Sequence, residues 1–598
     1  MADRATYFAY NDDGQLALIT RPGDGSETIG FTYDHDHPDQ LRVKTLPTGQ
    51  GALHYDYYPP DASTGAGQVQ TIVAPDDGVL RYTYDCSGLL FQEAWDGSQS
   101  GTFSGSVERI HDRHGRIAVE TVNFNHAVER EYDHDGFLIQ AGAMTFDPND
   151  QTGLLDGTTL GEVTDAVSRN QFGEVTEYSA SYDGAPVLGV DYHDRDNRGR
   201  ITHRTETLDL GTPTTEESYY RYDRAGRLTH VCSDEACSSG NVRAHYVYDA
   251  NSNRAAGSYY LRNGVPETLA TVVYDSQDRL LQYNDTRYEY TANGELTLKS
   301  EYSGATLTRE TSYDYDALGN LRQAVITDAT TTPDTVTTIE YVIDGQNRRI
   351  GKKVNGVLVQ GFLYENQLRI AAELDGDGNV RSRFVYGDKV NVPEYMIRNG
   401  QTYRLITDHL GSPRLAVNTA TGAVVQQIDY DEFGVVTTDT NPGFQSFGFA
   451  GGIFDRDTKL TRFGERDYDA MAGRWTAKDP IGFEGGDLLL YGYGVQDPVN
   501  NTDPSGEKLA EYVAVLASMG ATYAVFSWAA GDCGGSLLGN TGAAVVPGLV
   551  VYGTGPVGLG LVTSMWWGHA LGAIGGAAQL VGDATTAGIK GTAGDCGK

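Results

Sequence analysis

A short unit that recurs between Tyr7 and Gly400 restricts the fold more than any other feature of this chain. Its clearest copy reads Tyr220-Arg-Tyr-Asp-Arg-Ala-Gly-Arg-Leu-Thr229, an alternating strand that ends in Tyr-Asp, a polar turn with Gly, and an apolar residue that opens the next strand. Asp223, Asp249 and Asp275 of successive copies are 26 residues apart. A fixed period of this length indicates a repeat architecture in which neighbouring units cover one another's apolar faces.

The residue types of the unit explain why it should form a β-hairpin. Tyr-x-Tyr places two rings on one face of a strand, where they can stack on the neighbouring repeat. The Asp that follows can accept hydrogen bonds from the turn backbone, and Gly or Asn supplies a positive φ. We therefore expect the Tyr-Asp pairs to be scaffold and not catalytic. Further copies lie at Tyr82–Leu90, Tyr132–Leu138, Tyr246–Arg254 and Tyr313–Leu321, and weaker ones at Ile110–Ile117, Tyr192–Asp194 and Tyr288–Leu296.

The repeated Tyr-Asp-x-x-Gly-Arg-Leu resembles the YD repeats of the RHS family, which also includes teneurins and the C component of insecticidal Tc toxins. The resemblance covers about the first five sixths of the chain. It implies an all-β fold in which a spiralling strip of β-hairpins forms a hollow shell, and we assign residues 1–403 to this strip. Whether this many repeats close a complete shell stays open at this point.

Composition argues against several classes of ligand. The formal charge of −36 over 598 residues argues against a nucleic-acid partner, because phosphate binding needs clustered Lys and Arg. We expect no cofactor and no metal. His35 and His37 are interpreted as part of a polar turn after Tyr33-Asp; a metal between them is the less favoured alternative, because two ligands fall short of a set. Cys232 and Cys237 could close a small loop if the protein is exported.

A denser series of motifs follows, and we assign residues 404–506 to it. The ordered set resembles the RHS repeat-associated core, which closes one end of the shell. Its members include Thr407-Asp-His-Leu-Gly-Ser-Pro-Arg-Leu415, Asp429-Tyr-Asp-Glu-Phe-Gly434, Arg466-Asp-Tyr-Asp469, Gly473-Arg-Trp475, Asp479-Pro-Ile-Gly482 and Asp503-Pro-Ser-Gly506.

The resemblance further implies an aspartic autoprotease that cuts its own chain after the second Asp-Pro-x-Gly. Its catalytic residues would be Arg466, Asp479 and Asp503. Two neighbouring carboxylates share a proton, so one can activate a water while the other protonates the carbonyl oxygen or the leaving amine. The Arg would hold the charge of the pair or the scissile carbonyl through its fork of donors.

The residues at the expected cleavage position are Gly506, Glu507 and Lys508. The family usually has Leu where this chain has Glu507, and a carboxylate there would be repelled by the two aspartates. The alternative is that both aspartates only cap turns in the shell plug. The residues by themselves leave the two interpretations open.

The remaining residues, 507–598, form an apolar tail with five acids and three bases. Leu509–Ala530 is predicted to be one apolar α-helix, long enough to span a bilayer. The uncharged run Cys533–Gly582 is broken at Pro547 and Pro556, which indicates two helices or a hairpin. Its small residues recur every four positions, as at a close helix–helix contact; they are Gly560, Ser564, Gly568, Gly572 and Gly576. We favour membrane insertion of this tail over a hairpin buried in a soluble protein.

These observations predict a secreted or cell-surface shell protein that encloses or presents its own C-terminal segment. That segment is predicted to be a membrane-active, pore-forming toxin released by self-cleavage near Gly506–Glu507. Its partners would be the tail itself, a target membrane, a secretion apparatus and an immunity protein. No secretory signal opens the chain at Met1, so we expect a fragment of something longer or another export route. The alternative is a non-enzymatic surface or adhesion protein anchored by the apolar tail.

Overall fold

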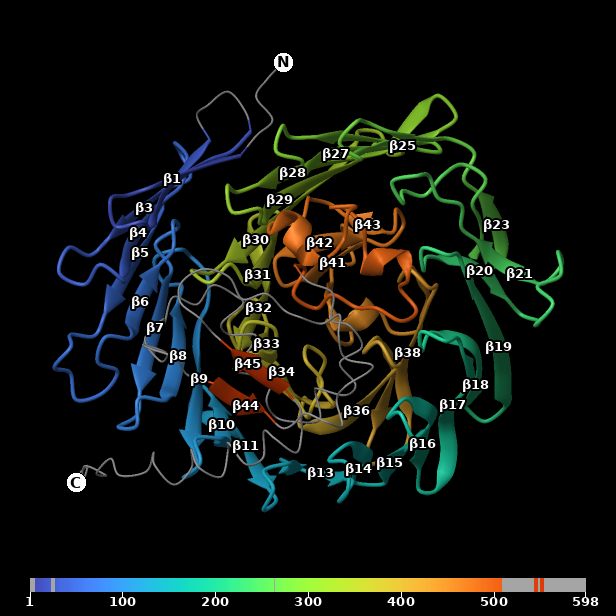
Figure 1. Cartoon of the computed structure of the whole chain (residues 1–598), viewed down its shortest axis with the longest axis horizontal. Helices are drawn as coiled ribbons and strands as arrows, with labels where there is room; N and C mark the ends of the chain where they lie inside the picture. Colours follow the sequence, from blue (N-terminus) through green and yellow to red (C-terminus); the bar gives the residue numbers. More distant parts are fainter. Residues whose placement is uncertain (1–5, 23–26, 263, 508–542, 547–548, 553–598) are drawn as a thin grey trace.

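The computed structural model describes residues 6–22, 27–262, 264–507, 543–546 and 549–552. Within these residues there are strands, turns and three short 3-10 helices, but no α-helix. Nearly every strand is antiparallel to the next one in the chain, so two large sheets form one long meander. Figure 1 shows this meander curving round into a ring; the green strands complete its outline at the top, and the yellow and orange strands lie inside it. The prediction of an all-β spiralling strip is confirmed.

The first sheet has 23 strands. They are β1 (Tyr7–Tyr10), β2 (Leu16–Thr20), β3 (Thr28–Tyr33), β4 (Leu41–Thr45), β5 (Ala52–Tyr57), β6 (Val69–Val73), β7 (Val79–Tyr84), β8 (Leu90–Asp96), β9 (Ser104–His111), β10 (Ile117–Val122), β11 (Asn125–Tyr132), β12 (Leu138–Ala141), β13 (Met144–Pro148), β14 (Leu155–Leu160), β15 (Val163–Arg169), β16 (Val175–Tyr182), β17 (Ala185–Arg195), β18 (Ile201–Asp209), β19 (Pro213–Tyr222), β20 (Leu228–Cys232), β21 (Val242–His245), β22 (Tyr259–Arg262) and β23 (Val265–Thr268).

The second sheet has 16 strands and runs on to Asp439. They are β24 (Val272–Tyr274), β25 (Leu280–Tyr283), β26 (Thr286–Tyr290), β27 (Leu296–Ser303), β28 (Thr306–Tyr315), β29 (Leu321–Asp328), β30 (Thr335–Ile343), β31 (Arg349–Val354), β32 (Val357–Tyr364), β33 (Ile370–Leu374), β34 (Val380–Val385), β35 (Tyr395–Arg398), β36 (Gln401–Thr407), β37 (Pro413–Asn418), β38 (Val424–Tyr430) and β39 (Val436–Asp439).

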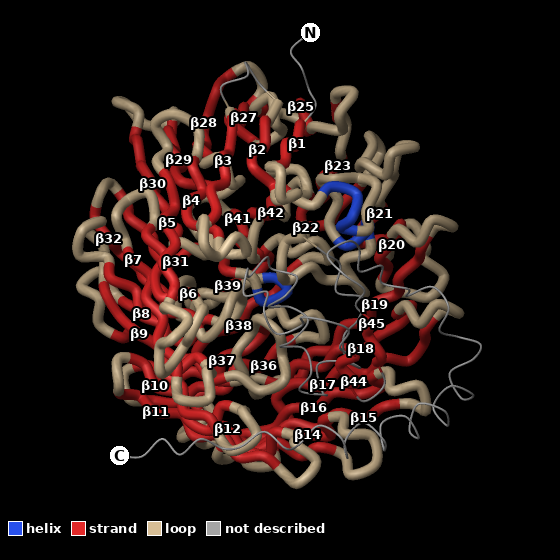
Figure 2. The backbone as a smooth tube through the Cα atoms, turned by 60° about the vertical axis from the view of Figure 1, so that its left-hand side comes forward, coloured by secondary structure: helices blue, strands red, loops and turns tan. Residues whose placement is uncertain are grey.

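A small four-stranded sheet follows, which we call the plug together with its loops, residues 440–507. Figures 1 and 2 both place its strands β41 and β42 beside strands of the ring. Its elements are η1 (Phe449–Gly451), β40 (Ile453–Phe454), β41 (Leu460–Phe463), β42 (Arg466–Asp469), β43 (Arg474–Trp475), η2 (Gly482–Gly485) and η3 (Gly494–Gln496).

Each repeat closes its own turn and then bonds to the next repeat. Asp223 Oδ1 accepts the N–H of Arg227, whose Nε donates to the other carboxylate oxygen at 2.7 Å. The guanidinium of Arg227 then lies over the ring of Tyr248, 4.8 Å from its centroid. The hydroxyl of Tyr248 donates to the carbonyl oxygen of Leu228 at 2.8 Å. The Tyr-Asp pairs are thus scaffold, as predicted, and the Arg is the third member of the unit.

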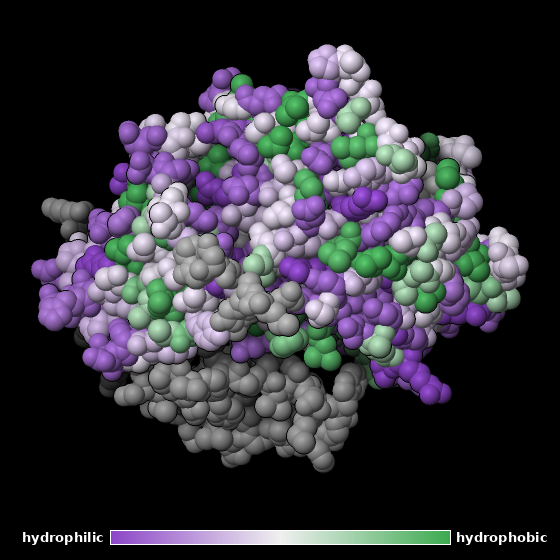
Figure 3. All heavy atoms as spheres, turned by 90° about the horizontal axis from the view of Figure 1, so that it is seen from above, coloured by the Kyte–Doolittle hydropathy of each residue, from purple (hydrophilic) through white to green (hydrophobic). Residues whose placement is uncertain are grey.

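The spiral is held together by apolar clusters that combine strands of both large sheets. One cluster joins Trp95 and Phe103 to Phe362 and Phe384, and another joins Met144 to Tyr395. These contacts connect parts of the chain more than 200 residues apart, so they set the curvature of the strip. Figure 3 shows hydrophilic residues spread over the outer face seen there, with smaller hydrophobic groups between them.

A buried ion-pair network, the seam, joins the same two layers. It consists of Glu120, Arg130, Glu365 and Arg383, whose side chains are all at most 6% exposed. Arg383 Nη2 lies 2.6 Å from Glu120 Oε1. Arg130 bridges Glu120 and Glu365 at 3.5 and 3.3 Å. Because buried charges are costly without partners, the seam specifies which strands face each other.

The described part of the tail differs from the prediction. Residues 543–546 and 549–552 form two antiparallel strands, β44 (Ala543–Val546) and β45 (Leu549–Tyr552). Of the two options predicted for this run, two helices or a hairpin, the helices are wrong over these residues, and the chain forms a hairpin of strands. Half of the residues in each strand are Val, and branching at Cβ favours a strand over a helix. The helix predicted over Leu509–Ala530 lies outside the described residues. In the part of the chain that the structure describes, we find no helix long and apolar enough to cross a membrane.

Candidate functional site

The turn between β41 and β42 brings the site together. Gly464 has a positive φ of 33°, and a Cβ on it would overlap the carbonyl oxygen of Ser505. The N–H of Glu465 donates to that same oxygen at 2.9 Å. Because Gly464 has no side chain, the end of the plug, residues 503–507, can pack against Arg466, the residue that begins β42.

Arg466 is 4% exposed and contacts both predicted aspartates. Its Nη2 lies 2.9 Å from Asp479 Oδ2 and 3.1 Å from Asp503 Oδ2, which places those two oxygens within about 6 Å of each other. The guanidinium stacks over the ring of Trp475 at 4.2 Å, and Nη1 donates to the carbonyl oxygen of Leu490 at 3.4 Å. The three predicted residues, far apart in the chain, therefore share one cluster.

Asp479 follows β43 in a turn whose backbone it caps. Its N–H donates to the carbonyl oxygen of Leu490, and its Oδ1 accepts the N–H of Ile481, both at 3.0 Å. Burial raises the pKa of Asp479 from 3.8 to about 6; Asp503 adds to the rise and Arg466 opposes it. Asp479 can thus exchange a proton near neutral pH.

Asp503 is 4% exposed and contacts the chain that follows it. Its Oδ1 accepts the N–H of Glu507 and the hydroxyl of Ser505, each at 3.1 Å. Burial also raises the pKa of the Asp503 carboxyl, against the effect of Arg466. Burial lowers the pKa of Arg466 itself.

The peptide bond between Gly506 and Glu507 is held on both sides. Arg466 Nε donates to the carbonyl oxygen of Gly506, while the amide N–H of Glu507 donates to Asp503. Gly506 has a φ of 71°, and a Cβ there would lie 2.5 Å from the carbonyl oxygen of Phe463. Lys508 lies outside the described residues. This arrangement offers a donor to a carbonyl oxygen, an acid–base group beside the amide nitrogen, and a second carboxyl with a pKa near neutral.

Two residues that sequence reasoning missed border the cluster. A Cβ on Gly485, in η2, would lie 2.6 Å from Asp479 Oδ2 and 2.7 Å from the carbonyl oxygen of Glu507. Asp487 has a buried Oδ2 without a hydrogen-bond partner among the described residues, and burial raises the pKa of its carboxyl. Both residues lie between the two Asp-Pro-x-Gly motifs. The twenty residues from Phe483 to Thr502 are the only sequence signal that a loop covers the site here.

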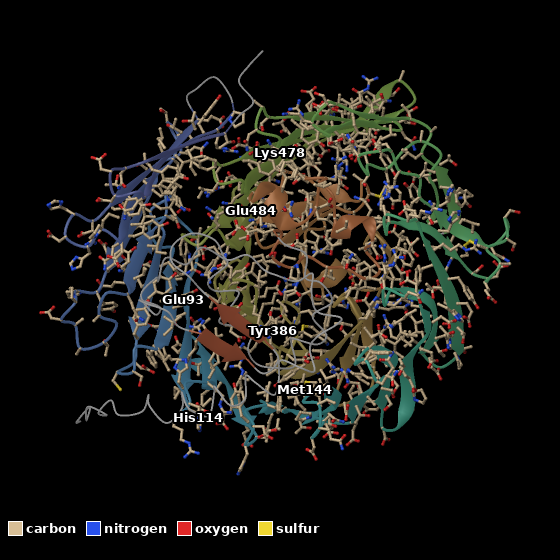
Figure 4. All side chains as sticks on the ribbon, viewed as in Figure 1. Glu93, His114, Met144, Tyr386, Lys478 and Glu484 are labelled. Atoms are coloured by element: carbon tan, nitrogen blue, oxygen red, sulfur yellow. A yellow bond between two sulfur atoms is a disulfide. The ribbon has the colours of Figure 1, made fainter. Side chains whose placement is uncertain are left out.

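Neighbours of this loop reach the ring wall, by which we mean the strands β1–β39 of the two large sheets and their turns. Figure 4 labels Lys478, directly before Asp479, and Glu484 in η2, and both lie on the plug. A Cβ on Gly294 of the wall would lie 2.8 Å from Lys478 Cε. The hydroxyl of Tyr491 donates to the carbonyl oxygen of Gly294 at 2.8 Å. The loop over Asp479 is therefore anchored to the ring.

The remaining candidates lie elsewhere. The N–H of His37 donates to Asp34 Oδ1 at 2.8 Å in the turn after Tyr33, the polar-turn geometry that was favoured for His35 and His37. No group of three or more His, Cys, Asp or Glu in the described residues could hold a metal ion. Cys232 and Cys237 form a disulfide that closes a small loop after β20.

Comparisons with known proteins agree with this architecture. A family model described as Teneurin YD-shell matches residues 2–489. The chain is 25% identical to Teneurin-1 of Gallus gallus over 476 residues and 28% identical to Teneurin-3 of Danio rerio over 526 residues. These alignments cover 78% and 84% of this chain, but the chain spans only 16% and 18% of the length of the relatives. It is also 26% identical to the tRNA nuclease WapA of Bacillus subtilis over 287 residues, which are 47% of this chain and 11% of that protein.

Among solved structures, the crystal structure of TcdB2-TccC3 superimposes with a TM-score of 0.61 at 14% identity, covering 84% of this chain and 28% of that one. The structure of TcdB2-TccC3-TEV gives a TM-score of 0.60, also at 14% identity, over 84% and 27% of the two chains. At this identity the likeness concerns the fold. Since the family model matches well over half of the residues, the chain belongs to the Teneurin YD-shell family of RHS/YD-repeat proteins.

Proposed function

We propose that this protein is a YD-repeat shell that cuts its own chain between Gly506 and Glu507 and encloses or presents the severed segment, residues 507–598. One observation carries the proposal. The single peptide bond at the expected cleavage position is hydrogen-bonded through its carbonyl to Arg466 and through its amide to Asp503.

The contacts suggest a role for each residue. Ionised Asp479 takes a proton from a water whose oxygen attacks the carbonyl carbon of Gly506. Arg466 stabilises the negative charge that develops on the carbonyl oxygen. Asp503 in its protonated form gives its proton to the nitrogen of Glu507 as the C–N bond breaks. The products are a carboxylate on Gly506 and a free amine on Glu507.

The mass of the expressed chain under denaturing conditions tests this proposal. Self-cleavage yields a body ending at Gly506 and a small C-terminal piece, whereas Asp479→Asn and Asp503→Asn should each leave one species at 64.7 kDa. Asp497→Asn is the matched control, because Asp497 is also a buried plug aspartate but contacts Asn500 and not Arg466. A wild-type chain that stays whole would refute self-cleavage.

We further propose that the severed segment acts on a membrane, because Tyr512–Gly531 carries no charge. The proposed partners are a target membrane, a secretion apparatus and an immunity protein, and the proposed location is outside the cell or at its surface. Dye leakage from liposomes is the test, with the uncut Asp503→Asn chain as control. Leakage should require the cut chain; equal leakage from both proteins, or none, would contradict this role.

The alternative is a non-enzymatic surface protein that the apolar tail anchors. It is favoured by the turn-capping bonds that Asp479 and Asp503 make to Ile481 and Glu507. Fractionation separates the two functions, because an anchor leaves the intact chain in the membrane of the producing cell.

A further inference from the structure

Two cations of the ring wall reach across to β42, the strand that begins with Arg466. Arg349, the first residue of β31, places Nη2 at 2.9 Å and 3.0 Å from the two carboxylate oxygens of Asp467. Lys299 of β27 places Nζ at 2.8 Å from Asp469 Oδ2. These side chains are nearly buried, with exposed fractions of 3% for Arg349 and 12% for Lys299. The partners are 118 and 170 residues apart in the chain.

The alternation of a strand explains why these contacts matter for the site. Asp467 and Asp469 point to one face of β42, whereas Arg466 and Tyr468 point to the other. Arg466 meets the two candidate aspartates there, and Tyr468 donates its hydroxyl to the carbonyl oxygen of Phe433 at 2.8 Å. A slip of β42 by one residue would turn Arg466 away from the aspartates.

Arg349 is itself held in a fixed place. Its guanidinium lies over the ring of Tyr341, 3.7 Å from the centroid, and this ring belongs to the neighbouring strand β30. Asp467 also accepts Arg462 of β41 at 3.2 Å, so the carboxylate is held from both the plug and the wall. The wall side of β42 is therefore a rigid, charge-paired support.

We propose that Arg349 and Lys299 are positioning residues for Arg466, and that the assembled wall switches on self-cleavage. The inference rests on the proposed function. Until β27 and β31 pack on the plug, Asp467 and Asp469 lack these cations and the register of β42 is not secured. The chain is then cut only after the wall that surrounds the plug has formed.

Arg349→Met and Arg348→Met make a matched pair for the test. Arg348 is the preceding residue, its side chain is equally buried at 3%, and its partners Glu93 and Asp344 both lie in the wall, at 2.6 and 2.7 Å. Each protein is expressed into inclusion bodies, so that it stays unfolded and uncut. It is dissolved in urea and diluted into buffer, and the uncut fraction is followed on denaturing gels. We expect Arg349→Met to slow cleavage at least about tenfold, as small misplacements of a catalytic group do. Arg348→Met shows the effect of breaking a buried pair within the wall, and it should slow cleavage less than Arg349→Met does.

The pH profile separates positioning from general loss of structure. Arg466 lowers the pKa of Asp479, so displacing Arg466 should raise that pKa. The pH at which the cleavage rate reaches half of its maximum should then move to a higher value. We expect this shift in Arg349→Met. Arg349→Lys, which restores the charge, should return the midpoint toward the wild-type value, and Arg348→Met should show no shift. Equal slowing of both Met variants, without a pH shift, would overturn the inference.

A second measurement does not need cleavage. Because Arg466 stacks on Trp475 at 4.2 Å, the emission of Trp475 reports on its position. Because the chain has five Trp, the emission of Trp475 is measured as a difference. For the wild type and for each variant, the emission of the same protein carrying Trp475→Phe is subtracted. A wild type that never cuts itself refutes the proposed function, while a changed Trp475 emission in Arg349→Met alone still supports positioning. Unchanged emission in Arg349→Met refutes the positioning.

Discussion

The pKa of Asp479 predicts how the proposed self-cleavage depends on pH. Burial raises this pKa from 3.8 to about 6, and as the base Asp479 must be ionised, so the rate should rise with pH through about 6. With that pKa, about a tenth of the molecules are ionised at about pH 5 and about nine tenths at about pH 7. The rate constant should therefore rise about tenfold between these two values.

The assay starts from inclusion bodies, in which the chain is unfolded and uncut. The chain is dissolved in urea and diluted into buffers from about pH 4.5 to 8.5, and the uncut fraction is measured over time. Tryptophan emission in the same samples reports refolding, so a folding-limited rate is recognised. Two other buried acids have a raised pKa of about 7, Glu465 and Asp497. Asp497→Asn should leave the limb where it is. A rate constant that is equal at about pH 5 and pH 7, a midpoint near 3.8, or a midpoint that moves in Asp497→Asn would refute Asp479 as the base.

Two further predictions concern the seam and the loop over the site. Glu120→Gln removes a buried partner of Arg383 and should lower the free energy of unfolding by about 3–5 kcal/mol in urea titrations. Arg81→Met, which breaks an exposed ion pair, should change the free energy of unfolding by less than about 1 kcal/mol. Similar losses in the two variants would contradict the role of the seam. Gly485→Ala puts a Cβ 2.6 Å from Asp479 Oδ2 and should slow cleavage, followed on denaturing gels, about tenfold or more. Cleavage of Gly485→Ala at the wild-type rate would show that the loop does not confine Asp479.

The repeat unit can be predicted from the sequence because its interactions are local. Asp223 bonds to Arg227 four residues later, and the turn needs Gly226, which has a φ of 101°. The alternation of Tyr220 and Tyr222 assigns the strand in the same way. The stacking of Arg227 on Tyr248 was not predicted, because it joins two repeats and depends on how far the strip twists between them.

The site could be anticipated only in part. Arg466, Asp479 and Asp503 came from the resemblance to the RHS core, and the structure brings all three together. Gly485 had no recognisable pattern, because its role depends on a close approach of two loops. Conversely, the apolar run around Ala543–Val546 suggested two helices or a hairpin, and the described residues there form a hairpin of two strands.

By itself, the sequence determines the β-hairpin unit, the acidic surface and the position of the apolar tail, because each follows from residues that are neighbours in the chain. Tertiary structure alone decides that Arg349 and Lys299 support the strand that carries Arg466, across 118 and 170 residues. Pairings over such distances depend on the curvature of the whole strip, which is the sum of many small twists and inter-layer contacts. No local pattern records that sum.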